Sequence, residues 1–82
     1  MEHELKCWPE YFAKVDDGSK TFEVRKDDRG YKQGDILVLR EWDPVVARYS
    51  GRSIHKRVTF ILRGGSFGIE AGHVVMALSH GG

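Results

Sequence analysis

Residues 18–25 constrain the fold most, because a helix pattern ends there and a strand pattern begins. Before this stretch apolar residues recur at helical spacing, and Pro9 suits the first position of a helix. Gly18 is well placed to close that helix in a left-handed conformation. Beyond Gly18 the side chains alternate, with Phe22 and Val24 on one face and charged residues on the other. The sequence therefore predicts a short helix followed at once by a strand.

Further strands are predicted along the rest of the chain, separated by turns rich in glycine, proline and aspartate. These further strands cover residues 3–7, 36–42, 53–63 and 73–79. With the strand that follows Gly18, the total is about five. Mostly sequential strands with one early helix predict an α+β fold with a curled, largely antiparallel sheet. Closure into a small β-barrel is the economical arrangement, because it leaves no sheet edge unpaired.

The length of 82 residues suits one domain, residues 1–82, with a thin hydrophobic core. No apolar run approaches the ~20 residues that span a bilayer, and the charged N-terminal residues do not resemble a secretory signal. The sequence therefore predicts no membrane partner. A single cysteine cannot form an internal disulfide, which favours a reducing cytoplasm. Residues 80–82 resemble a frayed end, and the oligomeric state is not predicted.

No metal site or cofactor is predicted. His3 and Cys7 lie four residues apart on a strand, roughly 13 Å by the rise per residue, which is too far to share an ion. The glycine-rich loop 64–68 has neither dinucleotide-binding spacing nor the lysine of a phosphate-binding loop. Cys7 shares its strand face with Leu5, so we expect a buried structural thiol rather than a nucleophile.

Basic residues are concentrated in residues 44–69, which contain no acidic side chain. This span carries Arg48, Arg52, His55, Lys56, Arg57 and Arg63. Such a concentration indicates a side that faces a polyanion, and a solvated strand face with scattered arginines is the alternative. The backbone N–H groups around Gly65, next to Arg63, could approach a phosphate. Alternatively, the loop is a wide hairpin in which Phe67 tucks under the barrel.

Aromatic side chains in loops beside arginines are suited to stacking a splayed base. Trp42 at a strand end and Phe67 in the glycine-rich loop are candidates for this role. Trp8, by contrast, begins the helical stripe that continues with Tyr11, Phe12 and Val15. The spacing therefore predicts that Trp8 is a core or staple residue.

Three ionic side chains, Lys20, Glu23 and Arg25, are concentrated where the helix gives way to the strand. A lysine near a glutamate in a partly buried pocket can act as a proton-transfer pair, or can bind a phosphate and a base edge. The alternative is a surface ion pair, which contributes only ~0–1 kcal/mol to stability. Spacing alone does not separate these interpretations.

The segment Gly18-Ser19-Lys20-Thr21-Phe22-Glu23-Val24-Arg25 resembles the glycine-x-lysine-x-x-glutamate-x-arginine signature of the ASCH (activating signal cointegrator homology) superfamily, whose domains have a PUA-like β-barrel. The likeness covers nearly the whole chain and is closest to a branch of short bacterial and phage proteins. It includes the segments Leu5–Phe12, Gly34–Leu37 and Gly64–Ile69, together with Val74-Val75.

The resemblance implies a cleft beside the barrel that receives RNA or a nucleotide-like ligand, lined by Lys20, Glu23 and Arg25. Some members are amidohydrolases that act on acylated cytidine through a lysine, a threonine and a distant glutamate, and a ribonuclease is also known. The threonine of the amidohydrolases falls at the position of Glu23, so this chain departs from that pattern.

The preferred hypothesis is therefore an RNA- or nucleotide-binding module. Lys20 and Arg25 contact phosphate, and Glu23 either accepts from a base edge or orients Lys20. The further binding residues predicted are Trp42, Arg57, Arg63, Gly65 and Phe67. One alternative is a hydrolase, acting on a modified nucleoside or on RNA, in which Lys20 and Glu23 form a general acid–base pair. Another alternative is a protein-interaction module that uses an open sheet edge or a loop.

Overall fold

The computed structural model describes residues 1–80, so the expected frayed end lies outside the described residues at positions 81 and 82. Five strands and one helix follow each other along the chain. They are β1 (Glu2–Cys7), α1 (Pro9–Asp16), β2 (Phe22–Lys26), β3 (Ile36–Asp43), β4 (Arg48–Arg63) and β5 (His73–Leu78). The predicted α+β fold with a mostly antiparallel sheet is confirmed.

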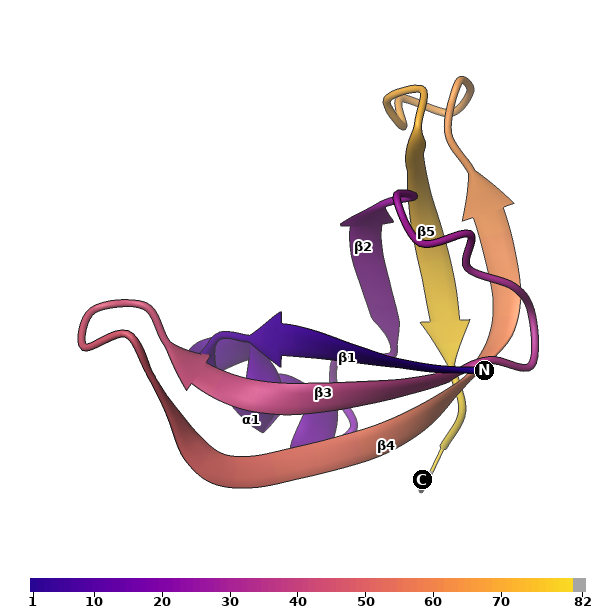
Figure 1. Ribbon diagram of the computed structural model, residues 1–82. Helices are drawn as coiled ribbons and strands as arrows, with labels where there is room; N and C mark the ends of the chain where they lie inside the picture. The colour runs from indigo at the N-terminus through magenta and orange to yellow at the C-terminus, as the bar shows by residue number, and fades with distance from the viewer. Residues whose placement is uncertain (81–82) are drawn as a thin grey trace.

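The strands form one sheet in the order β1-β3-β4-β5-β2, in which β1 is parallel to β3 and every other pair is antiparallel. The 16-residue strand β4 holds the sheet together, since its first half pairs with β3 and its second half with β5. Figure 1 shows β4 curving from a β1–β3–β4 half into an upright β4–β5–β2 half. β4 begins at Arg48, five residues before the strand predicted at 53–63.

The expected closure into a barrel is wrong, because β1 and β2 are the two edges of the sheet and do not pair within residues 1–80. Arginine side chains contact β1 at this open seam. Nη2 of Arg25 donates to the carbonyl oxygen of Lys6 at 2.7 Å, and Nη1 of Arg29 donates to that of Glu4 at 2.9 Å. Carbonyl groups of an edge strand are thus satisfied by side chains instead of a neighbouring strand.

Helix α1 packs its C-terminal half into the core and leaves its first turn outside. Phe12 and Val15 are buried among side chains of the sheet, including Leu37, Leu39 and Met76. Trp8 and Tyr11, from the same predicted stripe, are about half exposed. The expectation that Trp8 belongs to the core is therefore wrong.

Strand β2 has the predicted alternation, and its charged face is the one that turns inward. Glu23 is only 5% exposed, and Arg25 on the same face is partly buried, whereas Phe22 and Val24 on the opposite face are largely exposed. A buried carboxylate is tolerable only when it is paired and hydrogen-bonded. The partners of Glu23 therefore decide which face of β2 can be buried.

A second buried polar pair joins β1 to the residue that precedes β3. The Nε2 atom of His3 lies 2.8 Å from Oδ2 of Asp35, and both residues are almost fully buried. The backbone N–H of Lys32 donates to the same oxygen. The hydrogen bond with His3, the largest of several causes, holds the pKa of Asp35 below its ordinary value of 3.8.

This pair predicts a specific acid sensitivity. Because the pKa of Asp35 is lower in the folded state, its stabilising effect is complete above pH ~4 and is lost as the pH falls through the folded pKa. Asp35→Asn should lower the free energy of unfolding by about 1–3 kcal/mol at pH 7, and should lessen the decline below pH ~4. Urea unfolding across this pH range checks both effects. An unchanged pH profile in Asp35→Asn would contradict the assignment.

Candidate functional site in the open seam

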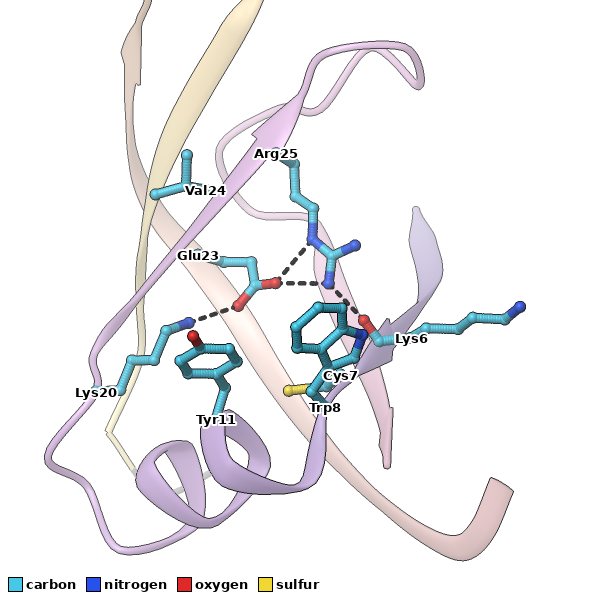
Figure 2. A pocket seen from close by; sticks show the side chains of 8 residues that line it. All are labelled: Lys6, Cys7, Trp8, Tyr11, Lys20, Glu23, Val24 and Arg25. Atoms are coloured by element: carbon cyan, nitrogen blue, oxygen red, sulfur yellow. Dashed lines mark hydrogen bonds and ion pairs between the residues drawn. The ribbon is translucent and has the colours of Figure 1, made fainter. Parts of the chain in front are cut away.

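A cavity of about 400 Å³ lies in the open seam between β1 and β2, and we call it the seam cavity. Its wall comes from the end of β1, the start of α1 and the strand β2 (Figure 2). The lining residues are Lys6, Cys7, Trp8, Tyr11, Lys20, Glu23, Val24 and Arg25. The structure thus brings together three of the predicted site residues: Lys20, Glu23 and Arg25.

The end of α1 positions Lys20. Gly18 adopts φ +86°, and its N–H donates to the carbonyl oxygen of Val15 at 3.2 Å. The N–H of Lys20 then reaches back to the carbonyl oxygen of Lys14 at 3.0 Å. A glycine in the left-handed region whose N–H bonds to the carbonyl three residues earlier is typical of a helix C-terminus. This turn places the Lys20 side chain beside the inward face of β2.

Glu23 is the centre of the charged group, because each of its oxygens accepts from a cation. Nζ of Lys20 donates to Oε1 at 2.9 Å, and Nε of Arg25 donates to Oε2 at 2.7 Å. Nη2 of Arg25 also lies 2.7 Å from Oε2 and donates to the carbonyl of Lys6, as Figure 2 shows. Glu23 therefore fixes the orientation of both cations.

Both cations keep donors for a ligand. Nζ of Lys20 has three N–H groups, and it bonds only Glu23 and the carbonyl oxygen of Phe22 within residues 1–80. Nη1 of Arg25 makes no hydrogen bond within the described residues. Two positive charges and one negative charge leave this group with a net charge of +1. A cavity of this kind favours an anionic ligand.

An aromatic pair completes the cavity. The rings of Trp8 and Tyr11 stack at an angle of 26° with centroids 6.3 Å apart, and both are about half exposed. Trp8 caps α1 through its backbone, since its carbonyl accepts from the N–H groups of Tyr11 and Phe12, and it has no side-chain capping bond. Its indole is therefore available to a planar ligand.

The thiol of Cys7 is buried against the seam cavity, as its strand parity predicts. Burial, together with the negative charge of Glu23, raises the pKa of Cys7 from 9.0 to about 11. A thiol with this pKa is protonated at neutral pH. The interpretation of Cys7 as structural rather than nucleophilic agrees with this geometry.

The other predicted site residues do not line the seam cavity. Trp42 and Arg57 lie on β3 and β4, and Trp42 packs edge-on against Tyr49 with their ring centroids 4.7 Å apart. Arg63, Gly65 and Phe67 lie at the end of β4 and in the loop that follows it. Phe67 is 83% exposed, so the alternative in which Phe67 tucks under the barrel is wrong.

Some of the cations in residues 44–69 lie beside acidic residues from the first half of the chain. Arg63 pairs with Asp27 at 2.9 Å, and Arg52 lies 3.6 Å from Asp16. Lys56 shares a small pocket of about 150 Å³ with Asp16 and Asp17. The uneven charge along the sequence is therefore partly neutralised across strands.

Sequence reasoning missed five residues that line the cavity: Lys6, Cys7, Trp8, Tyr11 and Val24. Lys6 contributes its backbone carbonyl to Arg25, while its ammonium group lies 4.0 Å from the centre of the Trp42 ring. A tryptophan immediately before a helix-starting proline was the available signal, since the side chain at that position need not follow the buried stripe of the helix.

Fold and site together define a small α+β domain with an open, five-stranded sheet and a charged, aromatic-lined cavity in its seam. The family model described as "Domain of unknown function (DUF3850)" matches residues 2–78, so the chain belongs to this family. The chain is also 44% identical over 57 residues to the "Uncharacterized 12.9 kDa protein in GpA 3'region" of Escherichia phage P2. That alignment covers 70% of this chain and 50% of the phage protein, so the match spans about half the length of the relative.

Neither a metal centre nor a membrane span is visible in the described part of the chain. Residues 1–80 contain no group of three or more His, Cys, Asp or Glu side chains arranged to hold an ion. The helix α1 has eight residues, and no helix in this range is long and apolar enough to cross a bilayer.

Proposed function

We propose that this protein binds a nucleotide unit in the seam cavity, either as a free nucleotide or as part of single-stranded RNA. The observation that carries the proposal is the combination, in one cavity, of an exposed aromatic pair with two cations held by a buried carboxylate. A volume of about 400 Å³ is within the usual range for small-molecule sites.

Each part of a nucleotide has a suitable partner in the cavity. A base can stack on Trp8, because base–aromatic stacking tolerates any base and contributes about 1–3 kcal/mol. Free N–H donors of Lys20 and Arg25 suit a phosphate, to which arginine presents a planar fork. Glu23 acts as a positioning residue, since both of its oxygens already accept from these cations.

The relationship to ASCH and PUA-like domains is part of this proposal, and it rests on the signature from Gly18 to Arg25. A reducing cytoplasm is also part of it, since the lone cysteine is buried and has no disulfide partner in the chain. Hydrolysis is less well supported. A general base needs an accessible oxygen, and Glu23 is buried between two cations.

Titration of a labelled single-stranded RNA at two salt concentrations tests the proposal. With two phosphate contacts, the affinity should fall about sevenfold between 50 and 200 mM salt. Lys20→Ala combined with Arg25→Ala should abolish saturable binding at low salt. Lys14→Ala with Lys32→Ala is the control, because it removes the same charge from exposed positions outside the seam cavity. The proposal fails if RNA does not bind at low salt, or if the two double variants weaken binding equally.

A further inference from the structure

The β4–β5–β2 half of the sheet has an outer face that is apolar and uncovered. On this side, opposite to Glu23 and Arg25, the strand register aligns two rows of side chains. One row is Phe22–Ala77–Phe60 and the other is Val24–Val75–Leu62, and we call these six residues the outer apolar face. Phe22, Val24 and Phe60 are 45%, 52% and 59% exposed.

Such a face is unusual in a protein this small. Single exposed apolar side chains are ordinary, but a contiguous group on one sheet face marks an interaction surface. The inner side of the same strands already packs on the core through Val74, Met76 and Leu78. The exposed side therefore needs a second layer to leave water.

We propose that the outer apolar face is the interface of a homodimer, in which two copies pack this face against each other about a two-fold axis. The first row favours a second copy as the occupant, because it alternates large, small and large side chains. Phe60 of one copy fits over Ala77 of the other, between that copy's two phenylalanines. A face that is complementary to itself is the requirement for a two-fold interface.

The lack of charged side chains in the outer apolar face also favours a second copy of the chain as its partner. Neither row contains a charged side chain, so a partner must be equally apolar, and the second copy meets this condition. Polar groups lie around the margin of the face: Lys26 pairs with His73 in the strand register, and Nζ of Lys20 lies 5.0 Å from the centre of the Phe22 ring. An apolar centre with a polar rim is the usual anatomy of an interface.

The exposed area limits the strength of the dimer. Because an aromatic side chain buries ~150–250 Å² in full, Phe22 and Phe60 together offer roughly 200 Å² per copy. Even with their neighbours included, the total stays below the ~1,200 Å² of a standard specific interface, which is the size range of weak and transient pairs. A weak dimer, with a dissociation constant on the order of 100 μM to 1 mM, is therefore expected.

Dimerisation and the proposed ligand binding use largely separate side chains, and Val24 is the one residue that both lines the seam cavity and belongs to the outer apolar face. In Figure 2 the side chain of Val24 lies on the opposite side of β2 from Glu23 and Arg25. Packing of the outer apolar faces therefore leaves both seam cavities open. A variant that disrupts the dimer at Phe60 should bind ligand with unchanged affinity, because Phe60 does not line the cavity.

Sedimentation velocity of the chain from micromolar to millimolar concentration tests the dimer. The wild type should move from monomer to dimer, with no larger species. Phe60→Glu should weaken the association about a hundredfold, because it buries an unpaired charge in the interface. Ala77→Arg should do the same by filling the space between the phenylalanines. Val45→Glu is the matched control, because Val45 is equally apolar and highly exposed but lies in the turn between β3 and β4.

Circular dichroism establishes that each variant is folded. If Phe60→Glu does not fold, the effect of Ala77→Arg on association tests the dimer instead. In the wild type, the methyl NMR signals of Val75 and Ala77 should shift with protein concentration. The dimer is refuted if the wild type stays monomeric at millimolar concentration, if it forms open-ended oligomers, or if Val45→Glu weakens association as much as Phe60→Glu.

Discussion

Glu23→Gln is expected to lower the free energy of unfolding by about 3 kcal/mol. The substitution keeps the shape of the side chain but removes the charge that Lys20 and Arg25 share. Removing one partner from a buried ion pair costs ~3–5 kcal/mol, and the partial exposure of both cations places this site at the lower end. For a domain of this size, the loss is a large fraction of the ~4–12 kcal/mol expected in total.

Urea unfolding at neutral pH measures this loss, and the midpoint of thermal unfolding should fall by roughly 12–24 °C. Glu4→Gln is the matched control, because Glu4 also pairs with an arginine, at 3.3 Å from Arg40, but on the exposed surface. The free energy of unfolding of Glu4→Gln should stay within about 1 kcal/mol of the wild-type value. Equal effects of the two substitutions would show that Glu23 does not hold the seam together.

Trp8→Ala is expected to weaken nucleotide or RNA binding by about tenfold or more, with little change in stability. The size follows from the ~1–3 kcal/mol that stacking contributes per base. Stability should be nearly unaffected, since the indole is about half exposed and makes no capping bond. The measurement is the dissociation constant for a labelled RNA oligomer, determined beside the unfolding curve of the same variant.

Trp42→Ala is the informative comparison for this prediction. Trp42 packs against Tyr49 and lies beneath the ammonium group of Lys6, outside the seam cavity. Its removal should cost stability and leave affinity nearly unchanged. If affinity falls with Trp42→Ala and not with Trp8→Ala, the ligand binds the outer side of β1 and β3, and the seam cavity is not the site.

Local features of the fold could be predicted from the sequence. The end of α1 at Gly18 and the alternation along β2 depend on backbone conformation and on the two-residue period of a strand. The choice of buried face could not be predicted in this way. It depends on the ion pairs of Glu23 with Arg25 and with Lys20, which precedes the strand. Because these pairs allow Glu23 to be buried, Phe22 and Val24 lie on the exposed face.

The absence of barrel closure could not be predicted from the sequence either, because it depends on contacts between segments that are distant in sequence. Whether β1 and β2 pair depends on the path of the whole chain between them and after them, and not on either strand alone. The basic residues within 44–69 indicate a side that faces a polyanion only as long as their acidic partners, which lie far away in sequence, are not considered. Arg63 and Asp27, for example, are 36 residues apart. Long-range pairing therefore limited both predictions.

Binding in the seam cavity is tested most directly by the indole N–H signals of the two tryptophans, followed by NMR during titration with single-stranded RNA and with mononucleotides. The chain contains only Trp8 and Trp42, so each signal reports on one place. We predict that the Trp8 signal shifts in a saturable way, while the Trp42 signal moves much less. A shift of Trp42 with Trp8 unchanged, or no shift of either at millimolar ligand, would contradict the account.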